Sequence, residues 1–187
     1  VIPYTIGDDL AGRLGEKLSN DTPAFRESIA AVEQRIAKFL GSRGKRSADS
    51  FHRQLGKITW DHCGISRNAS GLQKAIGEIE ALREEFETNL VVPGGNDQVN
   101  QEIERAGRVS DFFELAALMC RDALERNESC GGHFREEYQT KEGEARRDDE
   151  NFTYVAAWEW TGVGRPETLH KEPLEFEAVS PSQRSYK

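Results

Sequence analysis

Hydrophobic residues recur along most of this chain at steps of three and four, the spacing of one face of an α-helix. Four such stretches are separated by groups of Gly, Pro, Ser or Asn. The first begins at Thr22-Pro23, a capping side chain followed by proline at a first helical position, and ends at Gly41. Its apolar positions are Phe25, Ile29, Val32, Ile36 and Phe39. We expect this face to pack against other helices.

Three further stretches predict the helices of a bundle. The second follows capping candidates at residues 47–50 and stops near residues 67–68, the third ends at residues 91–95, and the fourth covers about residues 97–126. The second stripe comprises Phe51, Leu55, Ile58, His62 and Ile65, and the third comprises Leu72, Ile76, Ile79, Leu82, Phe86 and Leu90. The fourth stretch has two lanes, which predict contacts on two sides: Ile103, Ala106, Phe113, Ala117, Cys120 and Leu124, and beside them Val109, Phe112, Ala116, Met119 and Ala123.

The connections between these three stretches are short, which favours up-down-up packing. The predicted fold is therefore mainly α: an antiparallel three-helix bundle, spectrin-repeat-like, within residues 22–130, with an extra N-terminal helix that braces it or lies against a neighbouring domain. Residues 131–187 predict a loop and a β-hairpin tail, because residues 152–160 and 169–179 are short aromatic or β-branched runs around a turn. Trp158 and Trp160 on one strand predict that the hairpin lies against a surface.

Charge and composition limit the classes of partner that this chain is expected to bind. The formal net charge of −8 disfavours binding to a phosphate backbone, so we expect no nucleic-acid partner. No window reaches the ~20 apolar residues of a membrane span, so membrane association would come through another subunit. Cys63, Cys120 and Cys130 are odd in number and widely spaced, which favours reduced thiols. The start at Val1, with no basic and apolar leader, indicates a piece of a longer protein rather than a signal peptide.

The sequence gives only weak signals for a metal-binding or catalytic site. His62-Cys63 and Cys130-x-x-His133 could supply metal ligands, but neighbouring residues on a helix point about 100° apart and no third pair accompanies them. His133 with Asp148 or Glu136 could act as acid and base, although the alternating charges and glycines there favour a hydrogen-bonded turn that docks on another domain. We expect no catalytic, cofactor-binding or metal-binding residue in this chain.

One stretch carries a family resemblance. The run Arg126-x-Glu128-Ser129-x-Gly131-x-His133-x-Arg135, followed by Arg147-Asp148-Asp149-Glu150-Asn151, resembles the R-x-E-S-R-G-A-H-x-R signature and the RDD segment of succinate dehydrogenase and fumarate reductase flavoproteins. Gly64-x-x-Arg67, Asn100-Gln101-Glu102 and Arg184-x-Tyr186 also resemble family patterns, so the likeness covers nearly the whole chain. Cys130 and Gly132 depart from it, since they stand where the commoner signature has Arg and Ala.

The resemblance implies that this chain is the C-terminal helical domain of such a subunit, with residues 1–21 as the exit from an absent FAD-binding domain. It implies FAD in that domain, a capping domain over the dicarboxylate, iron–sulfur clusters in a partner subunit, and a membrane anchor met only indirectly. The complex would lie at the cytoplasmic side of the cell membrane, and this piece alone would be inactive. The residues expected at an interface with these partners are Arg126, Glu128, Ser129, His133, Arg135, Arg147, Asp148 and Asp149.

Two other hypotheses remain open from the residues alone. An independent three-helix scaffold would bind a helical partner through its charged face, but such a module would not expose Trp158 and Trp160 without a partner. A small metal-dependent hydrolase would require stoichiometric metal, and it ranks last.

Overall fold

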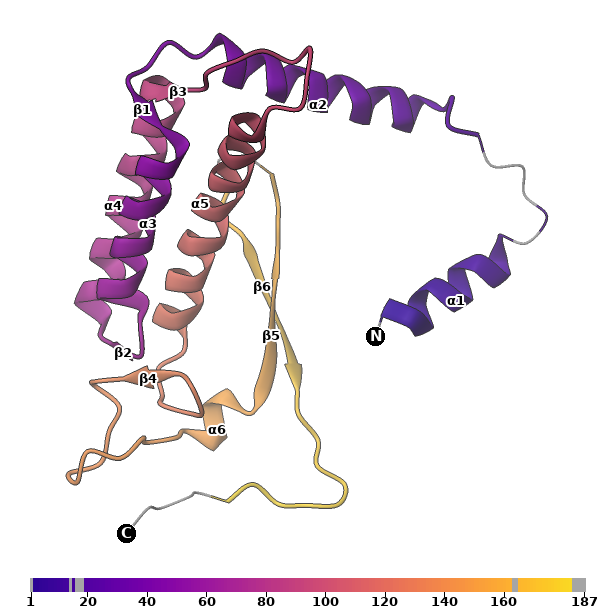
Figure 1. Cartoon of the computed structure of the whole chain (residues 1–187). Coiled ribbons are helices and arrows are strands. Elements are labelled where there is room, and N and C mark those ends of the chain that lie inside the picture. The colour runs from indigo at the N-terminus through magenta and orange to yellow at the C-terminus, as the bar shows by residue number, and fades with distance from the viewer. Residues whose placement is uncertain (1, 14, 16–18, 163–164, 183–187) are drawn as a thin grey trace.

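Three helices lie side by side in the computed structural model, which describes residues 2–13, 15, 19–162 and 165–182 (Figure 1). They are α3 (Ala48–Cys63), α4 (Ala69–Asn89) and α5 (Gln101–Glu125), and each contacts the other two. Successive helices run in opposite directions, and α2 (Pro23–Gly41) crosses one end of the group (Figure 1). The prediction of a mainly α fold is confirmed.

Side-chain caps fix where these helices begin. The predicted starts at Thr22 and Ser47 are confirmed: each hydroxyl accepts a hydrogen bond from the backbone N–H three residues on, at 3.4 and 3.3 Å. The carboxamide oxygen of Asn68 caps α4 in the same way at 2.8 Å. α5 begins four residues later than predicted, because Asn100 is its N-cap: the Asn100 side-chain oxygen accepts a hydrogen bond from Glu102 N. The Asn100 side-chain nitrogen donates to the carbonyls of Pro93 and Gly95 and so keeps the preceding residues in a loop.

The core is built around one aromatic ring. Phe86 of α4 meets Phe51 of α3 at 5.2 Å, Phe113 of α5 at 5.4 Å and Phe39 of α2 at 6.3 Å between ring centroids, in each case edge to face. All four rings are buried. The predicted stripes of α3, α4 and α5 therefore converge on Phe86, and Phe39 attaches the end of α2 to them.

Some apolar positions lie outside this core. Ile65 was predicted to continue the α3 stripe and is instead 88% exposed, because α3 ends at Cys63 and the chain then becomes extended. On α2, Phe39 is buried, but Phe25, Ile29 and Val32 are 51%, 55% and 57% exposed, so the expected packing of this face on other helices is found only at the carboxyl end of α2.

Two short parallel pairs join segments that are distant in sequence. β1 (Arg46–Ser47) pairs with β3 (Leu90–Val91) at one end of the bundle, and β2 (Ser66–Arg67) pairs with β4 (Phe134–Arg135) at the other (Figure 1). Periodicity gave no sign of either pair, because two residues are too few to show an alternating pattern. Each pair holds a loop against helix ends.

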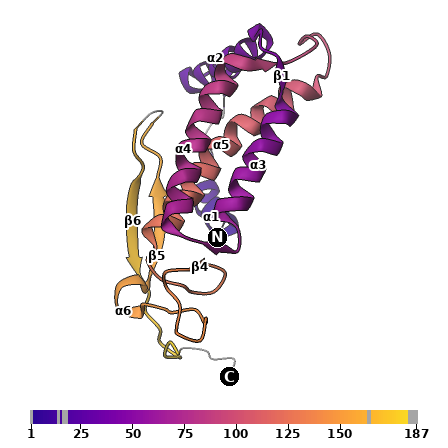
Figure 2. The same cartoon turned by 90° about the vertical axis from the view of Figure 1, so that its left-hand side faces the viewer.

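The predicted β-hairpin is confirmed. β5 (Tyr154–Glu159) and β6 (Thr168–Pro173) pair antiparallel and lie along the bundle (Figure 2). The second strand ends at Pro173, short of the predicted Val179, and Leu174 N makes one further hydrogen bond, to Thr153 O at 3.1 Å. Trp158 donates from Nε1 to Asp122 of α5 at 2.8 Å, which fixes the hairpin on that helix.

Two further helices were not predicted. α1 (Ile2–Gly12) lies within residues 1–21, which show little periodicity, and α6 (Asp149–Phe152) is a single turn in the charged segment after the bundle. The Arg184-x-Tyr186 likeness lies outside the described residues. Among the described helices, none combines the length and the hydropathy that crossing a bilayer requires.

Candidate functional site

Residues 126–137, here called the signature turn, follow directly after α5. The Ser129 hydroxyl accepts from Arg135 N at 2.8 Å and donates to Arg135 O at 3.1 Å. Cys130 and His133 exchange two backbone hydrogen bonds at 2.9 and 3.1 Å, around Gly131 with a φ of 59°. The turn therefore closes on itself, with a glycine at the left-handed position.

Arg135 lies inside the chain and caps α5. Its side chain is 2% exposed, and Nη1 donates to the carbonyls of Ala123 at 2.8 Å and Leu124 at 3.2 Å. Nε donates to Glu137 at 3.2 Å. The last carbonyls of a helix have no intrahelical donor and carry the negative end of its dipole, so a cation there is doubly favourable.

Glu128 joins the signature turn to the segment that precedes α6. This carboxylate is 2% exposed and accepts from Arg126 Nε at 2.8 Å through one oxygen and from Asp148 N at 2.8 Å through the other. Arg126 also donates to Phe152 O at 3.2 Å. The buried charge is thus paired and hydrogen-bonded at both oxygens, as a buried carboxylate must be.

His133 is fixed in its neutral form by two partners. Nε2 lies 2.9 Å from Arg126 O, and Nδ1 lies 3.2 Å from Arg67 Nη1. A carbonyl can only accept, so Nε2 carries the hydrogen and the Nδ1 lone pair accepts from the guanidinium. Burial lowers the pKa of His133, and the positive charges of Arg67, Arg126 and Arg135 lower it further.

This arrangement predicts a pH-dependent stability. Below about pH 6.5 the unfolded chain protonates His133 while the folded chain resists, so the free energy of unfolding falls as pH falls through and below that value. His133→Gln retains hydrogen-bonding capacity without titrating, and its urea unfolding curve should lose this part of the slope between about pH 7.5 and 5.5. His52→Gln, at an exposed position, controls for loss of an imidazole. Equal slopes in all three proteins would contradict the assignment.

The other half of the expected interface lies around α6. Arg147 donates from Nε to Asp149 at 2.9 Å and from Nη1 to Ser182 O at 2.9 Å, and Asp148 caps α6 by accepting from Asn151 N at 3.2 Å. Asp149 is exposed, and Arg147 and Asp148 are half-buried.

The eight predicted residues therefore fall into two classes. Glu128, Ser129 and Arg135 are buried and form their hydrogen bonds with other groups of this chain. The other five residues are half-buried or exposed. The role of the set at an interface stays a prediction. Both ring nitrogens of His133 are engaged by other groups, so the acid–base pairing of His133 with Asp148 or Glu136 is not formed.

Sequence reasoning missed the contacts between the signature turn and the start of α4. Glu136 accepts from Ser66 Oγ at 2.8 Å and from Asn68 Nδ2 at 2.9 Å, and these two bonds lower its pKa. Glu137 accepts from the first amide of α4. The available signal was Gly64-x-x-Arg67, because Arg67 extends from that motif to His133.

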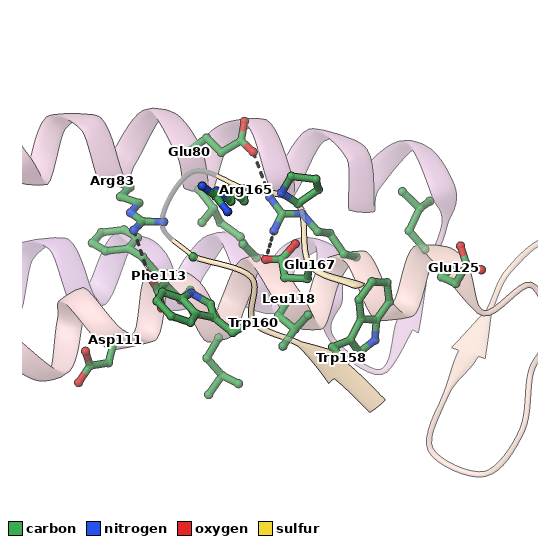
Figure 3. Close-up of a pocket in the computed structure, with 18 residues that line it drawn as sticks. Glu80, Arg83, Asp111, Phe113, Leu118, Glu125, Trp158, Trp160, Arg165 and Glu167 are labelled. Atoms are coloured by element: carbon green, nitrogen blue, oxygen red, sulfur yellow. Dashed lines mark hydrogen bonds and ion pairs between the residues drawn. The ribbon is translucent and has the colours of Figure 1, made fainter. Parts of the chain in front are cut away.

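A cleft of about 920 Å³ separates the hairpin from α4 and α5 (Figure 3). Five of its charged side chains pair with one another: Arg121 contacts Glu167 at 2.6 Å and Glu80 at 3.4 Å, and Arg83 contacts Glu114 at 3.1 Å. Trp160 lies at the cleft and is 65% exposed. Within the part of the chain that the structure describes, no three His, Cys, Asp or Glu side chains gather as a metal site would require.

Comparison with known proteins decides the family. The pattern of the family described as fumarate reductase flavoprotein C-term matches residues 52–186. The chain belongs to this family. The matched region includes the three bundle helices almost entirely, the signature turn and the hairpin. The resemblance seen in the signature residues is thereby confirmed.

The relatives of this domain are longer proteins. The fumarate reductase flavoprotein subunit of Haemophilus influenzae is 24% identical over 186 residues, which is 100% of this chain and 30% of that protein. An uncharacterized FAD-dependent oxidoreductase of Methanocaldococcus jannaschii is 34% identical over 122 residues, 59% of this chain and 20% of that protein. The chain thus spans less than a third of the length of these relatives.

Solved structures share the fold. A chain of Escherichia coli quinol fumarate reductase superimposes with a TM-score of 0.75 at 22% identity, covering 92% of this chain and 28% of that one. A chain of Mycobacterium smegmatis Sdh1 superimposes with a TM-score of 0.62 at 22% identity, covering 79% of this chain and 24% of that one. The domain therefore keeps its architecture at low sequence identity.

Proposed function

We propose that this C-terminal domain supports succinate–fumarate interconversion by packing on the FAD-binding domain of its own subunit, in an enzyme that exchanges electrons with quinone through an iron–sulfur subunit. The observation that carries the proposal is the uncovered apolar face of α2. A stable complex would lie at the cytoplasmic side of the membrane and would meet the membrane anchor subunit only indirectly.

One group of exposed apolar side chains belongs to the first two helices. Phe25, Ile29 and Val32 form one face of α2, and Ile6 and Leu10 on α1 are also at least half exposed. Apolar groups at helical spacing are the usual signature of a face that packs on another body. Since the relatives carry more than two thirds of their length outside the matched part, the FAD-binding domain is the occupant that we propose.

Among the residues that the structure describes, the two Gly-Gly pairs do not fit a flavin phosphate site. Gly94-Gly95 and Gly131-Gly132 both follow the carboxyl ends of helices, where backbone carbonyls repel phosphate rather than cradle it. We therefore place FAD and the catalytic residues in the other domains and expect the isolated chain to be inactive. Its part in the enzyme is to hold the domain geometry through α1, α2 and the surface around the signature turn.

Size-exclusion chromatography tests the packing directly. The chain is mixed with the flavin-bearing remainder of the subunit, and flavin absorbance is followed in the shifted peak. Co-elution is expected. A double change of Ile29→Glu and Val32→Glu should weaken the complex at least about tenfold, because two aliphatic side chains lose burial worth about 1.5–3 kcal/mol each.

Gln34→Glu is the matched control, because it adds a carboxylate on the opposite face of α2. This variant should bind as the unchanged chain does. Independent migration of two folded partners would instead favour the alternative, a three-helix scaffold that binds a helical partner. The exposed Trp160 argues against that alternative, since a stand-alone module gains nothing from an uncovered indole.

A further inference from the structure

Residues 174–179, here called the acidic segment, have the sequence pattern of a β-strand but belong to none of the described sheets. Strict alternation of apolar and polar residues is typical of a strand with one buried face. In the structure Leu174 is 42% exposed and Phe176 is 48% exposed, so the apolar side of the pattern is only partly covered. The residues that alternate are, in order, Leu174, Glu175, Phe176, Glu177 and Ala178.

The start of β5 explains why the acidic segment has no partner strand. β6 pairs with β5 as far as Pro173, which lies opposite Tyr154. Leu174 N then donates to Thr153 O at 3.1 Å. The residues before Thr153 form α6, so β5 cannot extend further in that direction. The acidic segment therefore leaves the hairpin beyond the end of its partner strand (Figure 1).

The backbone of the acidic segment is available for pairing. Within the part of the chain that the structure describes, residues 175–181 form no hydrogen bond and no ion pair, and all of them are exposed. The stretch is nevertheless held at both ends, by Leu174 N at its start and by Arg147 Nη1, which donates to Ser182 O at 2.9 Å. An exposed strand with unpaired N–H and C=O groups is a template for pairing with another strand.

The charges on this stretch indicate the chemistry of the partner. Glu175 and Glu177 form no ion pair with the described residues, and neither does Glu172 at the end of β6. Like charges on facing strands are destabilising, so a second copy of the same segment is a poor partner. The complementary partner is a strand that carries Lys or Arg at the facing positions.

We propose that the acidic segment adds as a strand to an open sheet edge, bordered by Lys or Arg, in the flavin-bearing remainder of its own subunit. This inference rests on the proposed function, in which this domain packs on that remainder. Arg147, which holds the far end of the stretch, is also one of the residues expected at that interface. In strand addition the main-chain hydrogen bonds supply affinity, and side chains such as Phe176 enter pockets that supply specificity.

Hydrogen–deuterium exchange with mass spectrometry tests the pairing. Exchange of the peptide that covers residues 174–180 is measured in the chain alone and in its complex with the flavin-bearing remainder. In the chain alone these amides should exchange rapidly. In the complex about every second amide should exchange at least about tenfold more slowly, because only alternate N–H groups face the added partner.

A charge reversal tests the chemistry of the edge. Glu177→Lys should weaken the complex about fivefold at low ionic strength, and by less at about 0.5 M salt, because exposed charges are screened. Glu84→Lys is the matched control, since Glu84 is an exposed carboxylate on α4 that also forms no ion pair with the described residues. This control should leave the affinity unchanged.

Three results would overturn this proposal while leaving the proposed function in place. One is a complex that co-elutes without slower exchange in residues 174–180, because the remainder would then pack elsewhere. Another is equal weakening by Glu177→Lys and Glu84→Lys. The third is slow exchange already present in the chain alone and increasing with its concentration, which would assign the segment to a second copy. If two folded partners form no complex, the proposed function fails and this inference fails with it.

Discussion

Arg135→Met is expected to lower the free energy of unfolding by about 3 kcal/mol. Methionine fills most of the buried volume, but it leaves the carbonyls of Ala123 and Leu124 without the charged donor that caps α5. An unsatisfied buried acceptor costs about 1–3 kcal/mol, and here two are created together. Arg135→Lys should show an intermediate loss, because an ammonium cannot reproduce the planar fork that serves the carbonyls and Glu137 at once.

Urea unfolding followed by circular dichroism measures this loss. Arg146→Met is the control, since Arg146 is an exposed arginine that stacks on the same Tyr138 ring as Arg135 and should change stability by less than about 0.5 kcal/mol. If the two variants lose equal stability, the buried cap is not what holds the end of α5.

Phe86→Ala is expected to cost about 3–5 kcal/mol, the range for removing a buried aromatic ring. The ring touches an aromatic partner on each of α2, α3 and α5, so its loss leaves a cavity where four elements meet. For a domain of this size the midpoint of thermal unfolding should fall by roughly 10 °C.

Differential scanning calorimetry tests that fall. Phe112→Ala is the control, because it removes a phenyl ring from α5 at a residue that is 37% exposed. The Phe112 ring contacts the imidazole of His52. Its midpoint should move much less. A Phe86 variant that matched the Phe112 variant would show that the bundle collapses around the vacancy.

The sequence predicted the parts of the fold that rest on local rules. The starts of two helices were predicted from Thr22 with Pro23 and from Ser47, because capping involves only residues within one turn. The two stripes that include Phe51 and Phe86 identified the core, since buried faces repeat at helical spacing. The hairpin followed from two β-prone runs around a turn.

The remainder depends on contacts between distant segments. Ile65 keeps the helical spacing, yet α3 stops at Cys63, and spacing cannot reveal where a helix ends. The burial of Arg135 follows from the orphan carbonyls of α5, which no pattern in the signature turn itself displays. The sequence predicted an apolar face of α2 around Ile29, but helical periodicity does not indicate which domain or subunit packs on that face.

The two short parallel pairs also set an order of assembly. β1 and β3 join the two ends of the helix pair α3 and α4, so we expect that unit to form from neighbouring sequence. β2 can pair only after β4, which lies beyond α5 in the sequence, has been brought to it. We therefore expect Arg135, which lies in β4, to reach its carbonyls late in folding. Interactions made after the rate-limiting step act mainly on the unfolding rate, so we expect changes in the signature turn to alter the unfolding rate more than the folding rate.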